Sequence, residues 1–412
     1  MFEKPLHFKH TTKNKNLERI NDLSPLSTTP ITIITYKYMK YTCVKENLEK
    51  ALDLVSGTAG KQVNLPILLN ILIQAEESGI KLISTNLEMA VKVQLRAKVE
   101  STGSFTVPAK TLTDFIHLLP EEQVEMELVE NELVIRCGSS STKIKGMSAE
   151  DFPVVPEVEE KHGYVLKVTK LKQALSQTVF ACAKNEVRPE LAGIYLGLFT
   201  ERFAGLVLAS TDSYRLAERK VKVEQGADEI KAIIPSRTVQ EIIRLLSLAK
   251  EEQGESQVRL WVSENQLAIR YDSFELTSRL VSGRYPDYTQ IVPANFKTNA
   301  LFSVSAMTKK IKAASLFTTM GVNAVSFDLN SSENSIAISS TSTQTGEHAS
   351  EMDAEVTGEE NSILLNHRYV LDGLQNLATE EAEFKMNSAD SPCLFRAKGN
   401  EDYLYIVMPI RQ

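Results

Sequence analysis

The chain has 412 residues, of which 42% are hydrophobic and 24% are charged, and its formal net charge is −7. This is the composition of an ordinary globular protein, with length for roughly two to four domains that each bury a core. The four cysteines lie far apart and form no Cys-x-x-Cys pair, which argues against a zinc ribbon or a disulfide scaffold and suits a reducing compartment. No apolar run approaches the roughly 18 residues of a membrane span.

The first 38 residues differ from the rest of the chain. They are rich in Lys, Asn, Thr and Pro, and they lack the apolar core and small-residue cleavage site of a secretory signal. Regular sequence begins at Met39. We expect either that Met39 is the native start or that residues 1–38 form a loosely held extension.

From residue 39 the chain begins with a short alternating strand and then an amphipathic helix over 45–55, in which Leu48 and Leu52 lie on one face. A strand over 79–84 follows, and a second helix is expected to begin at Pro108, because proline suits the first helical position. Further strands close this unit, with a turn at residues 130–131.

The same order then returns. Residues 129–136 (VENELVIR) resemble 263–270 (SENQLAIR), and 107–112 (VPAKTL) resemble 234–239 (IPSRTV). The spacing is far longer than the roughly 20–50 residues of a solenoid repeat, so it indicates a duplicated domain. The second copy predicts a helix over 170–183, a strand over 206–210 and a second helix from Pro235.

A third, more diverged copy predicts helices over 306–319 and from Asn366, with a Ser/Thr-rich hairpin over 331–346. Proline-rich linkers at 151–157 and 284–293 separate the copies. We therefore predict the α+β class, with three repeated domains that each pack two helices on antiparallel sheets. The predicted ranges are 1–38 for the extension and 39–161, 162–296 and 297–412 for the domains.

Positive charge is concentrated on the predicted helices although the chain as a whole is acidic. Residues 167–184 and 305–319 contain lysines and no acidic residue. The helix from Pro235 adds Arg237, Arg244 and Lys250 against Glu241. Such helices create a local positive field. Solvated helix faces are the alternative interpretation. No aromatic residues lie among these lysines, so attraction to a phosphate backbone without base readout is the better fit.

A search for catalytic motifs finds none that is complete. Residues 57–62 (GTAGKQ) lack the glycine spacing and the Ser/Thr of a phosphate-binding loop. There is no His-Glu-x-x-His motif and no Gly-x-Ser-x-Gly motif. The run Thr211-Asp212-Ser213 is more typical of a turn at the end of a strand than of a catalytic group.

The order and spacing of several motifs resemble the bacterial DNA polymerase III β subunit family, the sliding clamps, over residues 39–412. The motifs are NLPIL at 64–68, TNLEM at 85–89, TDSYRLA at 211–217, GRYPDY at 283–288 and YIVMPIR at 405–411. The resemblance implies three like domains per chain and a head-to-tail homodimer that closes a ring, with helices lining the hole and sheets outside. It also implies a DNA polymerase processivity factor through which duplex DNA passes without being read.

The family's second function is a partner-peptide pocket between the second and third domains. The resemblance places it at Leu191, Thr211, Ser213, Tyr214, Arg215, Leu216, Pro286, Ile291, Ser391, Val407, Met408, Pro409, Ile410 and Arg411. Ser213 and Tyr214 replace a Gly-His-like pair of the family. Apolar side chains suit a slot for leucine or phenylalanine anchors, and Met408 is an adaptable wall.

The resemblance also assigns DNA-facing residues and a dimer face. DNA-facing positions are Lys61, Gln62, Arg188, Arg237, Lys170, Lys172, Lys309, Lys310 and Lys312, with Gln62 standing where relatives carry arginine. The dimer face pairs Thr142, Lys143 and Ile144 with Leu316 and Phe317. Relatives often carry an aromatic residue in place of Thr142.

The implied partners are double-stranded DNA without sequence specificity, the DNA polymerase III α subunit, the clamp loader, other proteins with a clamp-binding motif, and a second copy of the chain. No catalytic residue, metal, cofactor or membrane partner is expected, and the implied location is the cytoplasm, in association with the nucleoid. Two alternatives stay open: an enzyme of three like domains that handles nucleotides, and a clamp-like scaffold that binds peptides without forming a ring.

Overall fold

The computed structural model describes residues 39–60, 65–155, 157–158, 160, 163–185, 187–249 and 256–411, which belong to one compact unit. The expected extension at 1–38 lies outside the described residues, as do Lys61, Gln62 and Lys250. None of the described helices is long and apolar enough to cross a membrane.

The first domain contains two helices, two short 3-10 helices and ten strands in the part that is described. In order these are β1 (Lys40–Val44), α1 (Lys45–Ser56), a 3-10 helix (Pro66–Leu69), β2 (Asn70–Glu76), β3 (Gly79–Thr85), β4 (Met89–Leu95), β5 (Lys98–Ser101), β6 (Gly103–Pro108), α2 (Ala109–His117), β7 (Gln123–Val129), β8 (Glu132–Cys137), β9 (Ser140–Lys145), β10 (Met147–Ser148) and a 3-10 helix (Ala149–Asp151).

The second domain repeats this order. Its elements are β11 (Gly163–Lys167), α3 (Val168–Val179), a 3-10 helix (Pro189–Leu191), β12 (Gly193–Thr200), β13 (Phe203–Thr211), β14 (Arg215–Val221), β15 (Ile230–Pro235), α4 (Ser236–Leu248), β16 (Gln257–Val262), β17 (Gln266–Tyr271), β18 (Phe274–Arg279) and a 3-10 helix (Tyr288–Ile291).

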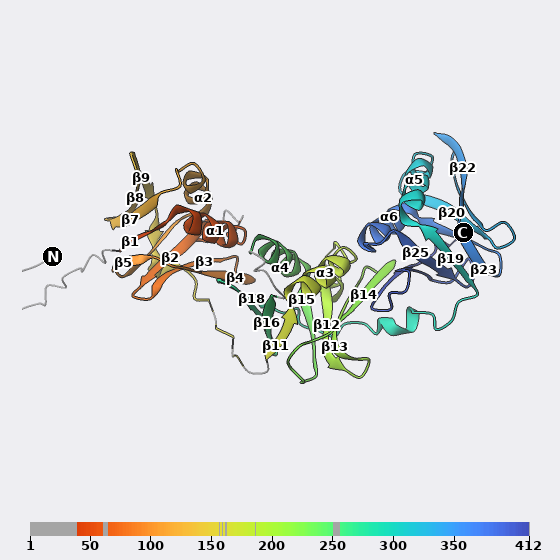
Figure 1. Ribbon diagram of the computed structural model, residues 1–412, viewed down its shortest axis with the longest axis horizontal. Coiled ribbons are helices and arrows are strands. Elements are labelled where there is room, and N and C mark those ends of the chain that lie inside the picture. Colours follow the sequence, from red (N-terminus) through yellow and green to blue (C-terminus); the bar gives the residue numbers. More distant parts are fainter. Residues whose placement is uncertain are drawn as a thin grey trace, which may run out of the picture. The chain divides into compact units, whose positions relative to one another are not determined.

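The third domain also has two helices. Its elements are β19 (Thr298–Ser303), α5 (Val304–Ser315), β20 (Ala324–Asn330), β21 (Ser335–Ser342), β22 (Gly346–Asp353), β23 (Glu355–Gly358), β24 (Asn361–Asn366), α6 (His367–Asn376), β25 (Glu381–Met386), β26 (Cys393–Ala397) and β27 (Tyr403–Val407). The predicted α+β class with paired helices in each of three repeats is confirmed, and Figure 1 shows each pair beside the strands of its own domain.

Neighbouring domains share a continuous antiparallel sheet. β4 of the first domain pairs with β18 of the second, so that one sheet has the order β10-β6-β2-β3-β4-β18-β17-β16-β11. β14 of the second domain pairs with β27 of the third in a sheet ordered β15-β12-β13-β14-β27-β26-β25-β19-β23. Main-chain hydrogen bonds therefore hold both domain junctions, which we call the first and second junctions.

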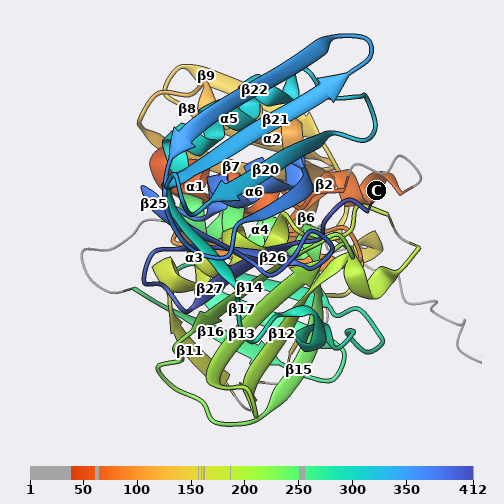
Figure 2. The same ribbon diagram turned by 90° about the vertical axis from the view of Figure 1, so that its right-hand side faces the viewer.

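Two outer sheets complete the first and third domains. The first has the order β5-β1-β7-β8-β9, and the other has the order β22-β21-β20-β24. β9 and β22 are thus edge strands within the described part of the chain. Figure 2 shows β22 beside β21 at the margin of its sheet.

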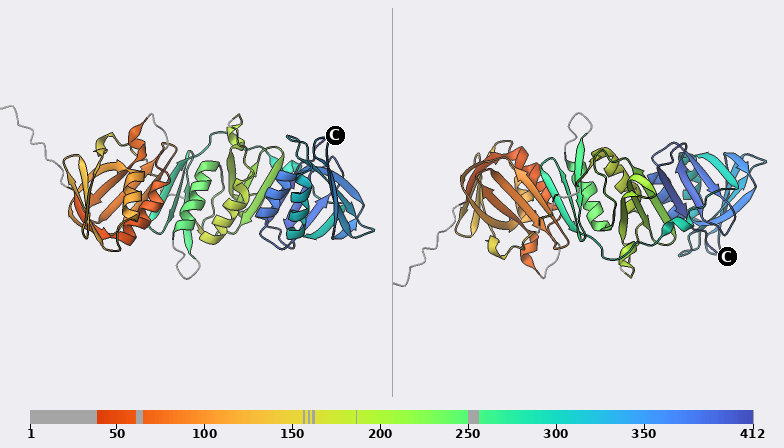
Figure 3. Two further views of the ribbon diagram at one scale, coloured as in Figure 1. Left: turned by 90° about the horizontal axis from the view of Figure 1, so that it is seen from above. Right: turned by 90° about the horizontal axis from the view of Figure 1, so that it is seen from below.

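The helices pack in pairs, α1 with α2, α3 with α4 and α5 with α6, and Figure 3 displays them on their domains. Leu48 and Leu52 of α1 are fully buried, as their spacing predicted. Several helix boundaries differ from the expectation. α3 and α5 begin and end earlier, because tight turns close them after Val179 and Ser315. Pro108 and Pro235 each precede the first residue of their helices, α2 and α4, instead of occupying the first helical position.

Candidate partner-binding and DNA-facing sites

The segment Thr211–Arg215 forms a tight turn between β13 and β14 at the second junction. Asp212 Oδ1 accepts hydrogen bonds from the main-chain N–H groups of Tyr214 and Arg215, at 3.0 and 3.1 Å. Thr211 Oγ1 accepts one from the N–H of Ser213 and donates to the carbonyl of Arg215. These bonds hold Ser213 at a φ of 78°, a left-handed conformation that is uncommon for a residue with a side chain.

Arg215 is the buried anchor of this turn, with a side chain that is 5% exposed. Its guanidinium lies 3.0 Å from Asp212 Oδ2 and 2.6 Å from Asp372 Oδ2 of α6, and it donates to the carbonyl of Phe180. Burial on its own would lower the pKa of Arg215, but Tyr405 and the two carboxylates hold that pKa above its ordinary value. The charge is therefore permanent and fully paired, so Arg215 fixes the site's shape.

The final residues of the chain run past this turn. The N–H of Met408 donates to the carbonyl of Tyr214 at 2.9 Å, and the N–H of Ile410 donates to the carbonyl of Leu364 at 2.8 Å. Met408, Pro409 and Ile410 are partly exposed, whereas Val407, in the last strand, is fully buried. The segment thus changes at Met408 from core strand to accessible surface.

An aromatic wall stands beside these residues. Tyr214 is 62% exposed, and its ring stacks on that of Tyr369 with centroids 6.3 Å apart. The guanidinium of Arg215 lies 4.7 Å from the centroid of the Tyr369 ring. Tyr369 and Asp372 of α6 were missed by sequence reasoning, because nothing in the pattern of that helix predicts that it meets a turn so distant in the chain.

An apolar cluster, Leu191, Ala209, Leu216, Ile233, Tyr285, Tyr288, Leu394 and Ile406, lies at the second junction. Ile291 packs against it. Leu191 and Leu216 are 3% and 0% exposed, so within the predicted pocket set they have the position of supporting core residues. Pro286 lines a neighbouring groove of about 270 Å³, with Tyr195 and Arg202. Ser391 lies two residues before β26, whose Cys393 pairs with Val407.

The lysines predicted to face DNA are accessible on their helices. Lys170 and Lys172 belong to α3, and Lys309, Lys310 and Lys312 belong to α5. All five are exposed or partly exposed, and none forms an ion pair with a carboxylate of the described residues. Arg237 is likewise exposed at the start of α4. Arg188 is half exposed and pairs with Glu190 at 3.0 Å.

Arg244 was counted among the charges of the basic helices, but its side chain lies at the contact between the first two domains. Its guanidinium pairs with Glu241 and donates to the carbonyl oxygens of Asp53 and Leu54 at the end of α1. It therefore joins the first two domains and adds little to the field of the basic helices. The first helix of the chain differs too, since α1 carries Glu46, Glu49 and Asp53.

The residues predicted for the dimer face lie at two edges. Thr142, Lys143 and Ile144 belong to β9, with Lys143 exposed and Ile144 buried. Leu316 is 70% exposed just after α5. Phe317 stacks on His348 of β22, with ring centroids 5.7 Å apart. The first set thus lies on β9 and the second lies beside β22, which are edge strands of the two outer sheets in the described part of the chain.

Three like domains that share sheets at their junctions and display a helix pair each define the fold of DNA clamps. Family models for the N-terminal, central and C-terminal domains of the DNA polymerase III beta subunit match residues 39–156, 165–287 and 289–411. The chain belongs to the DNA polymerase III beta subunit family.

Relatives and solved structures agree with this assignment. The chain is 29% identical over 380 residues to the beta sliding clamp of Synechococcus elongatus, covering 90% of this chain and 99% of the relative. It is 28% identical over 384 residues to that of Bacillus subtilis, covering 90% and 100%. The crystal structure of the Bacillus subtilis DNA polymerase sliding clamp has a TM-score of 0.84 at 27% identity, covering 91% of this chain and 100% of that chain. A sliding clamp from Pseudomonas aeruginosa bound to griselimycin has a TM-score of 0.85 at 26% identity, with the same coverage.

Proposed function

We propose that this chain is a DNA polymerase processivity factor that acts as a ring-shaped homodimeric sliding clamp. It encircles duplex DNA and tethers the DNA polymerase III α subunit, the clamp loader and other motif-bearing proteins. The observation that carries the proposal is the fold, since three like domains on shared sheets match sliding clamps over 91% of the chain. Its place of action is the cytoplasm, in association with the nucleoid.

The edge strands β9 and β22 support head-to-tail ring closure. An edge strand offers unpaired N–H and C=O groups to another strand, and a head-to-tail contact closes a ring when its rotation allows it. β9 carries exposed Lys143 and Lys145, whereas β22 carries exposed Glu347, Glu351 and Asp353. The opposite charges favour β9 of one chain against β22 of the next.

An exposed apolar residue beside β22 supports the same contact. Leu316 beside this strand offers apolar surface to the same neighbour.

The lysines of α3 and α5 support contact with the DNA backbone. They are flexible point charges without acidic partners in the described part of the chain, and they lie on helices, so they attract phosphates without reading bases. A ring holds DNA by topology, so weak and mobile contacts suffice. The acidic net charge of −7 keeps the remaining surface from binding DNA.

The accessible residues of the second junction support peptide docking. Tyr214, Met408, Pro409 and Ile410 together offer an aromatic wall and apolar surface, and buried Arg215 holds the turn behind them. Such a rigid apolar surface with few polar groups is typical of sites for short linear motifs.

The test is calorimetric titration of the full chain with a peptide of the Gln-Leu-x-Leu-Phe type. Saturable binding that is lost in Met408→Asp is expected, because the new carboxylate would be desolvated by the ligand. Val129→Asp, an exposed position on the β7–β8 hairpin, is the matched control and should leave binding unchanged. If Met408→Asp leaves the affinity for the peptide unchanged, the peptide does not bind at the second junction.

We propose in addition that the chain has no enzymatic activity of its own and needs no cofactor. ATP and magnesium belong to the chemistry of the loader and the polymerase. The proposal is supported by the family, and it excludes the alternative of a nucleotide-handling enzyme. A purified chain that hydrolysed ATP, with the activity co-eluting with the protein, would contradict it.

A further inference from the structure

The turn at the second junction has a duplicate at the first junction. Thr85 Oγ1 accepts from the N–H of Leu87 and donates to the carbonyl of Met89, as Thr211 does in its own turn. Asn86 Oδ1 accepts from the N–H groups of Glu88 and Met89 at 3.0 and 2.9 Å, in the manner of Asp212. Leu87 has a φ of 73°, close to the 78° of Ser213.

The strand end that hydrogen-bonds to each turn is equivalent as well. The N–H of Arg279 donates to the carbonyl of Glu88 at 2.9 Å, which reproduces the bond between Met408 and Tyr214. Each turn is joined to an outer apolar cluster by its sheet. At the first junction this cluster contains Ile67, Leu68, Leu72, Ile83 and Phe152. The backbone frame of the proposed peptide site thus occurs twice in one chain.

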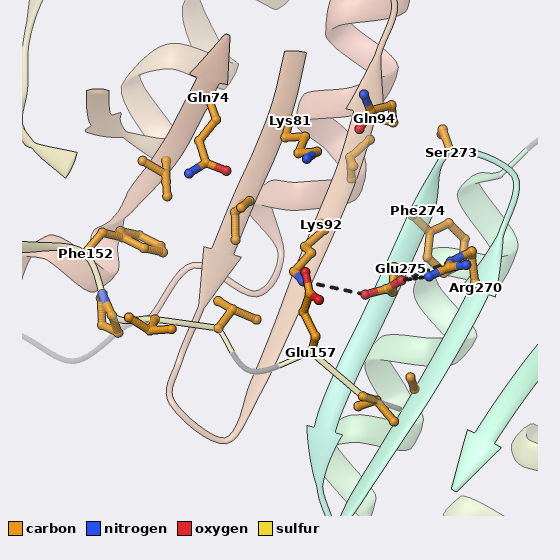
Figure 4. Close-up of a pocket in the computed structure, with 18 of the residues that line it drawn as sticks. Gln74, Lys81, Lys92, Gln94, Phe152, Glu157, Arg270, Ser273, Phe274 and Glu275 are labelled. Carbon is orange, nitrogen blue, oxygen red and sulfur yellow. Dashed lines mark hydrogen bonds and ion pairs between the residues drawn. The ribbon is translucent and has the colours of Figure 1, made fainter. Parts of the chain in front are cut away.

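The duplicate frame presents apolar side chains to the surface. Leu87 is 45% exposed and Val154, on the linker after the first domain, is 92% exposed. Both line a groove of about 100 Å³ between the turn and the linker. Val154 is shared with a larger groove of about 830 Å³, whose floor is formed by β2, β3, β4, β17 and β18. Figure 4 shows this floor, with Phe152 of the linker at one side.

The two junctions differ in how the linker fills the groove. At the second junction Tyr285 and Tyr288 both pack on Tyr195 of the sheet, with ring centroids 5.6 and 6.0 Å away. At the first junction Phe152 is the buried aromatic residue of the linker, and Val154 turns outward. The linker therefore presents aromatic rings at the second junction and an exposed valine at the first.

The charges around the first-junction groove are mainly negative. Three of its cations are already paired. Lys92 lies 3.7 Å from Glu275 and Arg270 lies 2.8 Å from Glu160, whereas Arg279 of the smaller groove is exposed and forms no ion pair with a described residue. Lys81 pairs with Glu76. Glu88, Glu150 and Glu157 are exposed carboxylates of the lining that form no ion pair with a described residue. This arrangement attracts positive side chains.

We propose that the first junction is a second docking site, which takes an extended peptide whose apolar residues are flanked by lysine or arginine. Leu87 and Val154 contact the apolar residues, and Glu88, Glu150 and Glu157 contact the basic flanks. The inference rests on the proposed function, because it takes the frame at the second junction to be a peptide site. Glu88 stands where the second junction has the neutral Tyr214, so the preference for basic flanks belongs to the first junction.

Two labelled peptides test the proposal on the full chain by fluorescence anisotropy. One contains Leu-Leu-Phe between lysines and the other contains the same core between aspartates. The double variant Leu87→Asp with Val154→Asp should bind the lysine-flanked peptide roughly tenfold or more weakly, because both apolar contacts are lost. Aspartate tolerates the left-handed conformation of residue 87, so the turn is retained. Met408→Asp should leave this peptide unaffected.

A charge reversal gives an independent readout. Glu88→Lys with Glu157→Lys should favour the aspartate-flanked peptide over the lysine-flanked one, without touching the apolar contacts. A lysine-flanked peptide with serines in place of its apolar residues should bind roughly tenfold more weakly. Equal binding of that serine peptide would mean non-specific attraction and would overturn the proposal.

The outcomes separate the two sites. If the Gln-Leu-x-Leu-Phe peptide binds in a Met408-dependent manner and the lysine-flanked peptide does not bind, the first-junction site is wrong and the proposed function stands. If Met408→Asp abolishes binding of the lysine-flanked peptide, both peptides share the second junction and the proposal fails. If neither peptide binds to the folded chain, the peptide site of the proposed function fails with it.

Discussion

The guanidinium of Arg244 donates a hydrogen bond of 2.7 Å to the main-chain carbonyl oxygen of Asp53, which joins helix α4 of the second domain to the end of helix α1 of the first. A second bond reaches Leu54, and Glu241 holds the guanidinium from its other side. A cation at the carboxyl end of a helix is favourable because it meets the negative end of the helix dipole. Arg244 is therefore a link between domains.

Replacement of Arg244 by alanine is expected to lower the free energy of unfolding by about 1–3 kcal/mol, because it leaves carbonyl groups and the Glu241 carboxylate without their donor. Chemical denaturation followed by circular dichroism measures the change. Arg237→Ala, on the same helix but exposed, should alter stability by less than about 0.5 kcal/mol. Equal effects of the two changes would contradict the assigned role of Arg244.

Charge reversal at Lys309, Lys310 and Lys312 is expected to weaken retention on DNA, more strongly at low salt than at high salt, because screening removes the interaction. Retention on nicked circular DNA after loading measures it. The matched control reverses Lys81, Lys222 and Lys231, which lie on or beside strands. A defect that does not depend on salt would indicate misfolding instead of lost phosphate contact.

Reversal of Lys143 and Lys145 to glutamate is expected to convert the dimer to monomer, because β9 would then meet the carboxylates of β22 in the partner. The reciprocal change of Glu347 and Glu351 to lysine should do the same when made alone. Mixing the two variants should restore a dimer, because both interfaces of the mixed ring then pair opposite charges. Sedimentation velocity measures the populations, and a mixture that stays monomeric would refute the assigned pair of strands.

The second junction permits a sharper test than sequence reasoning allowed. Leu191→Asp is unsuitable as a pocket variant, because Leu191 is 3% exposed and a buried carboxylate would unfold the cluster around it. Tyr214→Ser removes an exposed ring while it leaves the main-chain bond to Met408 in place. We expect the Tyr214→Ser variant to bind the Gln-Leu-x-Leu-Phe peptide roughly tenfold more weakly, while the thermal stability of the protein stays unchanged. Titration calorimetry and melting curves measure the two effects, and a large fall in melting temperature would show that Tyr214 is structural.

His367 predicts a dependence of stability on pH. The side chain is 8% exposed, and its Nδ1 has no hydrogen-bond partner among the described residues. Burial, followed by the charge of Arg368, lowers the pKa of His367 below its ordinary value. A lowered pKa in the folded state means that stability is full above the unfolded pKa of about 6.5 and is lost as pH falls through the folded value. His367→Gln should therefore lose less stability than the parent chain between neutral and mildly acidic pH. Parallel curves of unfolding free energy against pH would exclude this role.

The repeated architecture was predictable because hydrophobic periodicity is local. Leu48 and Leu52 lie on the buried face of α1, and the turn at residues 130–131 connects β7 and β8 as expected. The join between domains was not predictable in this way. The pairing of Leu216 in β14 with Ile406 in β27 links residues far apart in the chain, and alternation within either strand does not identify its partner.

Only part of the candidate site was predictable from the sequence, for a related reason. Motif resemblance gave its residues, but it did not separate accessible ones such as Met408 from buried ones such as Leu191. It also missed Tyr369 and Asp372, because α6 meets the turn around Arg215 only through tertiary packing. Likewise, the charge of Arg244 was visible in the sequence, whereas its contact with α1 was not.

The central claim is that the chain holds DNA by encircling it. The most direct test loads the protein onto nicked circular DNA with a clamp loader and ATP, isolates the complex, and then cuts the circle once. A topological ring slides off the new ends, so we predict rapid release after cutting and stable retention on the uncut circle at the same salt concentration. Equal retention on cut and uncut DNA would contradict the account, because it would show that the chain grips DNA by contact and not by closure.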